Sequence, residues 1–148
     1  DVHIVTQNID DLHERAGSQK ILHLHGEILK SRSTVDPHLI YTINGDVINE
    51  GDKCELGSQL RPHIVWFGEM VPALEDAAYI VSKADILIVV GTSLAVYPAA
   101  GLINYASPEA EKFLVNPDPG AGNIKGFKFI NANAGTGIPL LVKEILNR

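Results

Sequence analysis

The segment Ala84-Asp85-Ile86-Leu87-Ile88-Val89-Val90-Gly91 decides the fold class of this chain. Its unbroken aliphatic run ends in a glycine, a pattern typical of a central strand in a parallel sheet that is covered on both faces. Helical patterns precede it over 73–83 and follow it over 98–106. Because strand and helix patterns alternate outward from this segment, the sequence predicts an α/β domain with a parallel sheet.

The other elements continue this alternation in both directions. We expect a helical turn at 8–16, a final helix at 138–146, and further strands at 2–5, 21–25, 64–67, 113–116 and 126–130. Residues 27–61 differ, because short β-like pieces there alternate with turn signals such as Asn44-Gly45-Asp46. We therefore predict one domain formed by 1–26 and 62–148, with a small inserted module at 27–61.

The composition indicates a globular domain and argues against a membrane-spanning or nucleic-acid-binding protein. The chain has 148 residues, 45% hydrophobic and 20% charged, which indicates a packed core of about one domain. No apolar run approaches the roughly 18 residues of a membrane span. The net charge of −6, with no cluster of Lys or Arg, argues against nucleic acid as a partner.

Terminal and cysteine patterns give two further expectations. The N-terminus lacks a signal-peptide pattern and Cys54 is the only cysteine, so we expect a cytoplasmic protein without disulfides or a multi-cysteine zinc site. The chain starts at Asp1 and its only methionine is Met70. We therefore expect it to be the C-terminal part of a longer protein.

Three segments with glycine or asparagine follow predicted strands. Gly91-Thr92-Ser93 lies at the carboxyl end of the aliphatic strand, where backbone amides and hydroxyls suit a phosphate group. Asn116 ends the next strand, and Ala134-Gly135-Thr136-Gly137 precedes the last helix. Taken singly, the first segment is more simply a helix cap and Asn116 part of a turn. Together they predict an extended nucleotide cleft at one sheet edge.

Alternation over 21–25 places His23 and His25 on the same face of a strand. A histidine there suits proton transfer near neutral pH, with a structural role as the alternative. The pair could also bind a metal, but no nearby carboxylate or cysteine completes a ligand set, so we expect no metal site. The amides and carboxylate of Gln7-Asn8-Ile9-Asp10 suit a ribose. Trp66-Phe67 either lines an apolar channel or belongs to the core.

Several of these segments together resemble the sirtuins, which are NAD-dependent protein lysine deacylases, over essentially the whole chain. They are Val5-Thr6-Gln7-Asn8-Ile9-Asp10-Asp11-Leu12-His13, His25-Gly26-Glu27, Pro62-His63-Ile64-Val65-Trp66-Phe67-Gly68-Glu69, Gly91-Thr92-Ser93 with Val96-Tyr97-Pro98, and Asn116. Glu27, Trp66 and 96–100 are most similar to the bacterial and mitochondrial desuccinylase-like branch. The resemblance implies a Rossmann-like sheet with helices on both faces, NAD as a consumed co-substrate, and acylated lysine peptides or proteins as partners.

The resemblance also implies residue roles. His25 is the implied general base. The implied NAD-binding residues are Gln7, Asn8, Asp10, Gly91, Thr92, Ser93, Asn116, Gly135 and Thr136. The implied substrate-binding residues are Val65, Phe67, Gly68, Glu69 and Val96, with Phe67 bordering the acyl-lysine tunnel and the others pairing with the peptide backbone by strand addition.

Two departures from the sirtuin pattern qualify this interpretation. The N-terminal Gly-Ala-Gly loop that closes over NAD has no match here and would lie upstream. The four-cysteine zinc ribbon is degenerate, because Ser33 stands where a cysteine is expected and Cys54 is alone. We therefore expect that the chain binds no zinc, and that the module at 27–61 is either mobile or held together by other packing.

Two other functions remain as alternative interpretations: an ADP-ribosyltransferase, and a non-catalytic module that binds NAD or ADP-ribose.

Overall fold

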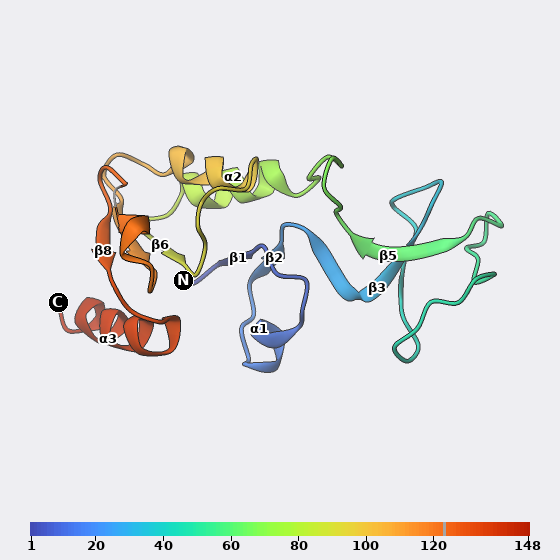
Figure 1. Cartoon of the computed structure of the whole chain (residues 1–148), viewed down its shortest axis with the longest axis horizontal. Helices are drawn as coiled ribbons and strands as arrows, with labels where there is room; N and C mark the ends of the chain where they lie inside the picture. Colours follow the sequence, from blue (N-terminus) through green and yellow to red (C-terminus); the bar gives the residue numbers. More distant parts are fainter. Residues whose placement is uncertain (123) are drawn as a thin grey trace. The chain divides into compact units, whose positions relative to one another are not determined.

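The computed structural model of the chain describes residues 1–122 and 124–148. These residues form two compact units, Asp1–Ala77 and Ala78–Arg148 (Figure 1). Each unit has its own sheets and buried residues. No helix in the described part of the chain is long and apolar enough to cross a membrane.

The first unit begins with a small β-α-β arrangement. Strands β1 (Ile4–Thr6) and β2 (Ile21–His23) pair in parallel, and helix α1 (Leu12–Arg15) lies between them in the chain. The helix is shorter than the predicted turn at 8–16, because Asp10 Oδ1 accepts the Leu12 N–H at 3.1 Å and the helix starts only after it. The parallel pairing confirms the α/β prediction for this part of the chain.

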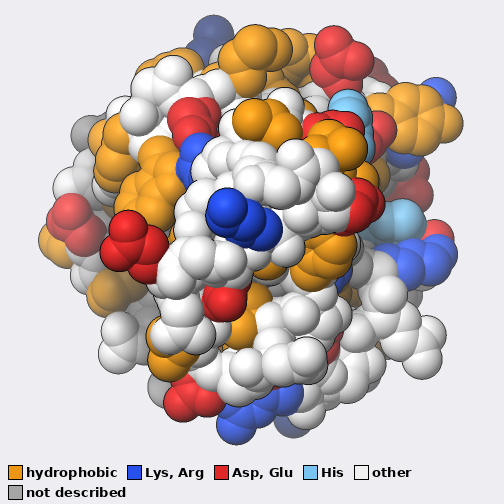
Figure 2. All heavy atoms as spheres, turned by 90° about the vertical axis from the view of Figure 1, so that its right-hand side faces the viewer, with side chains coloured by type: hydrophobic (Ala, Val, Ile, Leu, Met, Phe, Trp, Pro, Cys, Tyr) orange, Lys and Arg blue, Asp and Glu red, His pale blue; other side chains and the backbone are white. Residues whose placement is uncertain are grey.

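An antiparallel sheet makes up the rest of the first unit. Strand β3 (Gly26–Ser33) lies between β4 (Ile40–Thr42) and β5 (Leu60–Ile64). This sheet occupies the region where the sequence predicted an inserted module. The expected strand at 64–67 is wrong, since β5 ends at Ile64 and a turn follows it. On the face drawn in Figure 2, acidic, basic and apolar side chains are interspersed.

The second unit contains a parallel sheet with strand order β6-β7-β8. Its strands are β6 (Ile86–Val90), β7 (Glu111–Val115) and β8 (Lys128–Ile130). Its α-helices are α2 (Leu74–Ser82), which is shared with the first unit, and α3 (Ala134–Leu146). Two 3₁₀ helices, η1 (Ala99–Tyr105) and η2 (Pro119–Gly122), complete the unit. The aliphatic strand is confirmed, but β7 rather than β6 is the middle strand of this sheet. Residues 86 and 90 are accordingly more than one-third exposed.

The core of the second unit forms where α3 packs on β7. Phe113, Val115 and Leu141 are 2%, 0% and 2% exposed. The partly buried residues around them are Ile88, Ile130, Ile138 and Ile145. The helix starts at Ala134, four residues earlier than the predicted 138, and its buried face runs through 138, 141 and 145 at helical spacing. Val142 and Leu146 of the same helix are exposed.

Candidate functional site

His25 lies between β2 and β3, and both its ring and its backbone are held. Its Nδ1 is 3.1 Å from the carbonyl oxygen of Gln7. A carbonyl oxygen only accepts, so Nδ1 carries the proton in this hydrogen bond, and in the neutral imidazole the lone pair is on Nε2. The His25 carbonyl accepts the Val65 N–H at 2.9 Å. The half-buried imidazole therefore has a fixed orientation and one basic nitrogen, as a general base requires.

The loop after β1 carries the three polar residues of the first predicted ribose-binding group. Asn8 N–H donates to Thr6 Oγ1 at 3.1 Å, and Ile9 C=O accepts the Ile28 N–H at 2.8 Å. These contacts fix the loop backbone beside β3. The Asn8 side chain is exposed, while Gln7 and Asp10 are half-buried.

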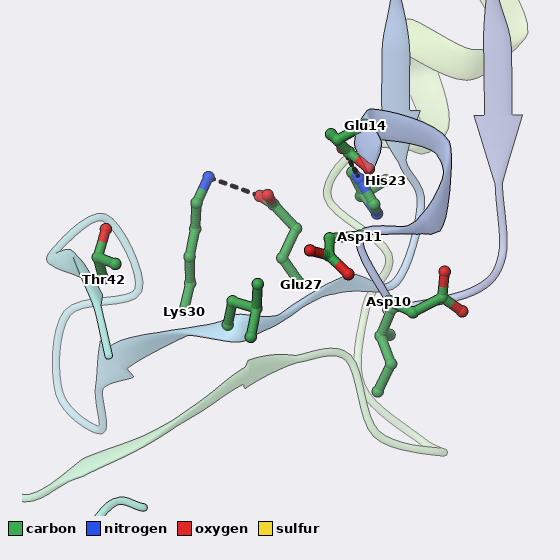
Figure 3. Close-up of a pocket in the computed structure, with 9 residues that line it drawn as sticks. Asp10, Asp11, Glu14, His23, Glu27, Lys30 and Thr42 are labelled. Carbon is green, nitrogen blue, oxygen red and sulfur yellow. Dashed lines mark hydrogen bonds and ion pairs between the residues drawn. The ribbon is translucent and has the colours of Figure 1, made fainter. Parts of the chain in front are cut away.

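A recess of about 270 Å³ opens in the first unit next to this loop (Figure 3). Its lining residues are Ile9, Asp10, Asp11, Glu14, His23, Glu27, Leu29, Lys30 and Thr42. Two polar contacts line it: His23 Nε2 is 2.7 Å from Glu14 Oε1, and Lys30 Nζ forms an ion pair with Glu27 Oε2 at 2.8 Å. The hydrogen bond from His23 lowers the pKa of Glu14.

The recess corrects the expectation that no carboxylate lies near His23. Ligand atoms of Glu14, His23 and Glu27 lie within 4.8 Å of one another. No local pattern indicated this contact, because α1 brings Glu14 back onto β2 from nine positions away. Each carboxylate already has a partner, Glu14 in His23 and Glu27 in Lys30, so we interpret the group as a set of hydrogen-bonded side chains.

Residues 66–69, which follow β5, form a turn with an exposed aromatic tip. The Glu69 N–H donates to the Trp66 carbonyl at 3.0 Å, and Glu69 Oε2 accepts the Trp66 N–H at 3.1 Å. The side chains of Trp66 and Phe67 are 53% and 95% exposed, so the alternative that they belong to the core is wrong. The hydrogen bonds from Arg61, then from Trp66 N–H, lower the pKa of Glu69 to about 2.

In the second unit, the segments after β6 and β7 meet at the carboxyl edge of the sheet, as predicted. Asn116, which is 7% exposed, donates from Nδ2 to the Thr92 carbonyl at 2.9 Å across 24 residues of sequence. Thr92 Oγ1 accepts the Leu94 N–H at 3.1 Å, within its own loop. The alternative that Thr92 and Ser93 cap the next helix is wrong, because η1 follows Pro98 and has no side-chain cap. Val96, in the same loop, is 44% exposed.

The third predicted segment lies within a helix rather than before one. Gly135 and Thr136 belong to the first turn of α3, and Thr136 Oγ1 donates to the Asn133 carbonyl at 3.1 Å.

Asn131 follows β8 and was not among the predicted site residues. Its Nδ2 donates to the carbonyls of Asn116 at 3.2 Å and Pro117 at 2.9 Å. An asparagine after a predicted strand, like Asn116, was the signal that could have found it.

Comparison with known proteins identifies the family. The model of the Sir2 family matches residues 1–98. The chain belongs to the Sir2 family. An NAD-dependent protein deacylase of Aggregatibacter actinomycetemcomitans is 54% identical over 121 residues, which cover 82% of this chain and 58% of the relative. A protein of the same name from Bacteroides thetaiotaomicron is 52% identical over 123 residues, covering 80% and 53%.

Solved structures agree in fold with this Sir2-family chain. A complex of a Sir2 homolog with NAD superposes with a TM-score of 0.83 at 37% identity, covering 99% of this chain and 59% of the other. Sir2Tm bound to a propionylated peptide gives 0.78 at 33% identity, covering 96% and 63%. The α/β Rossmann-like fold is thus confirmed. The chain spans between half and two thirds of the length of these relatives.

The zinc ribbon expected from the sirtuin pattern does not fit the residues of this Sir2-family member. Cys54 Sγ donates to Ser33 Oγ at 3.4 Å, and the two residues are 6% and 3% exposed. Ser33 Oγ also accepts the N–H groups of Val35 and Asp36, each at 3.2 Å. A single thiol bonded to a hydroxyl that already accepts two amides offers no tetrahedral thiolate set. The buried hydrogen bond between Cys54 and Ser33 connects these segments instead.

Proposed function

We propose that the whole protein is an NAD-dependent protein lysine deacylase that releases nicotinamide and O-acyl-ADP-ribose. The observation that carries this proposal is the His25 ring, held by Gln7 with Nε2 available as a base, in a chain whose relatives are named NAD-dependent protein deacylases. NAD supplies the ribose that receives the acyl group, and it is consumed. Acylated lysine peptides or proteins are the proposed partners, and the cytoplasm is the proposed compartment.

The proposed roles of the residues follow their positions in the two units. In Asp1–Ala77, His25 Nε2 takes a proton from a ribose hydroxyl, and Gln7, Asn8 and Asp10 bind the ribose and nicotinamide. In Ala78–Arg148, Asn116 and the segment 91–93 bind the phosphates and the adenosine ribose, with Gly135 and Thr136 beside the adenine. Phe67 borders the acyl-lysine, and Val65, Gly68, Glu69 and Val96 bind the peptide backbone. We assign 1–26 and 62–148 to the NAD-binding domain and 27–61 to the small module.

The experiment is product analysis by mass spectrometry with the whole protein, NAD, and a panel of acetyl-, succinyl- and glutaryl-lysine peptides. We expect O-acyl-ADP-ribose from wild type, with the preferred peptide reporting the acyl specificity. His25→Ala should lower turnover at least about 100-fold with NAD binding retained, because it removes the base. His3→Ala, at an exposed histidine, is the matched control. Unchanged deacylation by His25→Ala would contradict the assigned role, and ADP-ribose transfer to protein without an acyl group would favour a transferase.

A further inference from the structure

Two arginines face each other across the antiparallel sheet of the first unit. Arg32 on β3 and Arg61 on β5 are register partners. Like charges directly opposite each other on neighbouring strands destabilise a sheet. Both side chains are also largely covered, at 11% and 26% exposed. Such a pair therefore needs an anion that binds both guanidinium groups.

Glu69 is that anion. Arg61 donates from Nη1 to Oε1 at 2.6 Å and from Nη2 to Oε2 at 3.2 Å, which makes a bidentate pair. Arg32 Nη2 donates to Oε2 at 3.0 Å. We call Arg32, Arg61 and Glu69 the Glu69 cluster. One carboxylate thus accepts hydrogen bonds from arginines on β3 and on β5.

The Glu69 cluster fixes the backbone on both sides of the aromatic tip. Both guanidinium groups donate to the Ile64 carbonyl, at 3.3 Å from Arg32 and 3.2 Å from Arg61. The Glu69 carboxylate binds the Trp66 N–H at 3.1 Å. The chain from 64 to 69 is therefore tied at its start by the arginines and at its end by the carboxylate that they hold.

The segment held in this way exposes apolar side chains. Trp66 and Phe67 are 53% and 95% exposed. The same segment is joined to His25, whose carbonyl accepts the Val65 N–H. A protein binds with higher affinity when a contact surface is already ordered, because less conformational entropy is lost on binding. The Glu69 cluster orders this surface before any peptide arrives.

We propose that Arg32 and Arg61 are positioning residues for the acylated peptide, because by holding Glu69 they fix segment 65–69 in the shape that receives it. This inference rests on the proposed deacylase function. It assigns the side chain of Glu69 to an internal role and leaves peptide contact to the backbone and to Phe67. Among the described residues, the hydrogen bonds of the cluster reach Ile64 and Trp66 and none of the proposed NAD-binding residues, so its loss should affect peptide binding far more than NAD binding.

The test is steady-state kinetics of the whole protein with an acyl-lysine peptide and NAD, using Arg61→Met, Arg32→Met and Arg61→Lys. We expect the Met variants to raise the peptide KM about tenfold, the loss typical of a charge-assisted hydrogen bond, with kcat within about twofold. The KM for NAD should stay unchanged. Arg61→Lys should recover part of the effect, since it keeps the charge but not the bidentate geometry. Arg148→Met, which removes an arginine bound to Glu111 and Glu144, is the matched control.

A second readout separates positioning from general stability. Trp66 is the only tryptophan of the sequence, so its fluorescence reports the turn directly. The Met variants should increase iodide quenching of Trp66 while the protein still melts cooperatively. If they unfold, Arg61→Lys and Glu69→Gln carry the test. An unchanged peptide KM in folded, active variants would overturn this proposal alone, whereas absence of product from wild type with every peptide would overturn the proposed function and the inference together.

Discussion

The backbone of Gly26 lies against the carbonyl oxygen of His63, so closely that a Cβ on Gly26 would overlap that oxygen. Gly26 also has a φ of +86°, which L side chains rarely adopt. It pairs with Ile64 at the start of the antiparallel sheet, one residue after His25. The glycine of the His-Gly pair is thus what lets the chain turn from β2 into β3 with the imidazole in place.

Gly26→Ala should therefore destabilise the protein by more than the cost of placing alanine in a left-handed backbone conformation, because the added Cβ also overlaps the His63 carbonyl. Gly17→Ala is the control, because Gly17 has a φ of +88° with nothing within 4 Å of its added Cβ. We expect Gly17→Ala to cost about 1 kcal/mol in free energy of unfolding, and Gly26→Ala more than about 3 kcal/mol because backbone must move. Urea unfolding measures both. Equal losses in the two variants would show that the contact with His63 is unimportant.

Close approach also explains one of the two glycines at the start of α3. A Cβ on Gly137 would lie 2.7 Å from Val115 Cγ1, whereas one on Gly135 would meet nothing within 4 Å. We expect Gly137→Ala to destabilise by about 1 to 3 kcal/mol, as overpacking does. Gly135→Ala should instead stabilise the helix by about 0.5 to 1 kcal/mol. Thermal unfolding of both variants tests this opposite sign, and two losses of similar size would contradict it.

Contacts that depend on sequence patterning were predictable, and those that depend on tertiary geometry were not. The aliphatic run at 86–90 and the alternating elements indicated the parallel sheet, and loops at strand ends indicated that Thr92 and Asn116 meet. The order of strands was not predictable, because hydrophobicity marks a strand as buried without naming its neighbours. The Glu14–His23 pair and the Glu69 cluster join side chains from different elements, and no local pattern records such pairs.

Asn116→Asp should loosen the carboxyl edge of the sheet in the second unit, where we propose that NAD binds. The change keeps the Oδ1 that accepts the Asp118 N–H at 2.8 Å, but replaces the Nδ2 donor to Thr92 with an oxygen facing a carbonyl. We expect the affinity for NAD to fall about tenfold, through a lost hydrogen bond and a buried charge. Calorimetric titration with NAD measures it. Asn147→Asp, at an exposed position after α3, is the control, and an unchanged affinity in Asn116→Asp would contradict the assigned role.

The small module should be stable without metal. Because the buried hydrogen bond between Cys54 and Ser33 connects its segments, and Ser33 also accepts from the amides of Val35 and Asp36, EDTA should leave the melting temperature unchanged. Cys54→Ala should lower the free energy of unfolding by about 1 to 2 kcal/mol, through a small cavity and a lost hydrogen bond. Ser18→Ala, outside the module, is the control. A melting temperature lowered by EDTA, or stoichiometric zinc in metal analysis, would contradict this account.

The Glu69 cluster makes the free energy of unfolding depend on pH between about 2 and 4.5. Its partners lower the pKa of Glu69 from 4.5 to about 2, so the folded protein binds this proton less readily than the unfolded chain. The resulting stabilisation is fully present above pH 4.5 and is lost as the pH falls toward 2.

Glu69→Gln removes that dependence, because glutamine keeps the size of the side chain without its charge. The difference in melting temperature between wild type and Glu69→Gln should be constant between pH 7 and pH 5, shrink below pH 4.5 and vanish near pH 2. Calorimetry across this range measures it, with the exposed Glu50→Gln as a control that should show no such trend. A difference that stays constant down to pH 2 would mean that the carboxylate of Glu69 is not what the two arginines hold.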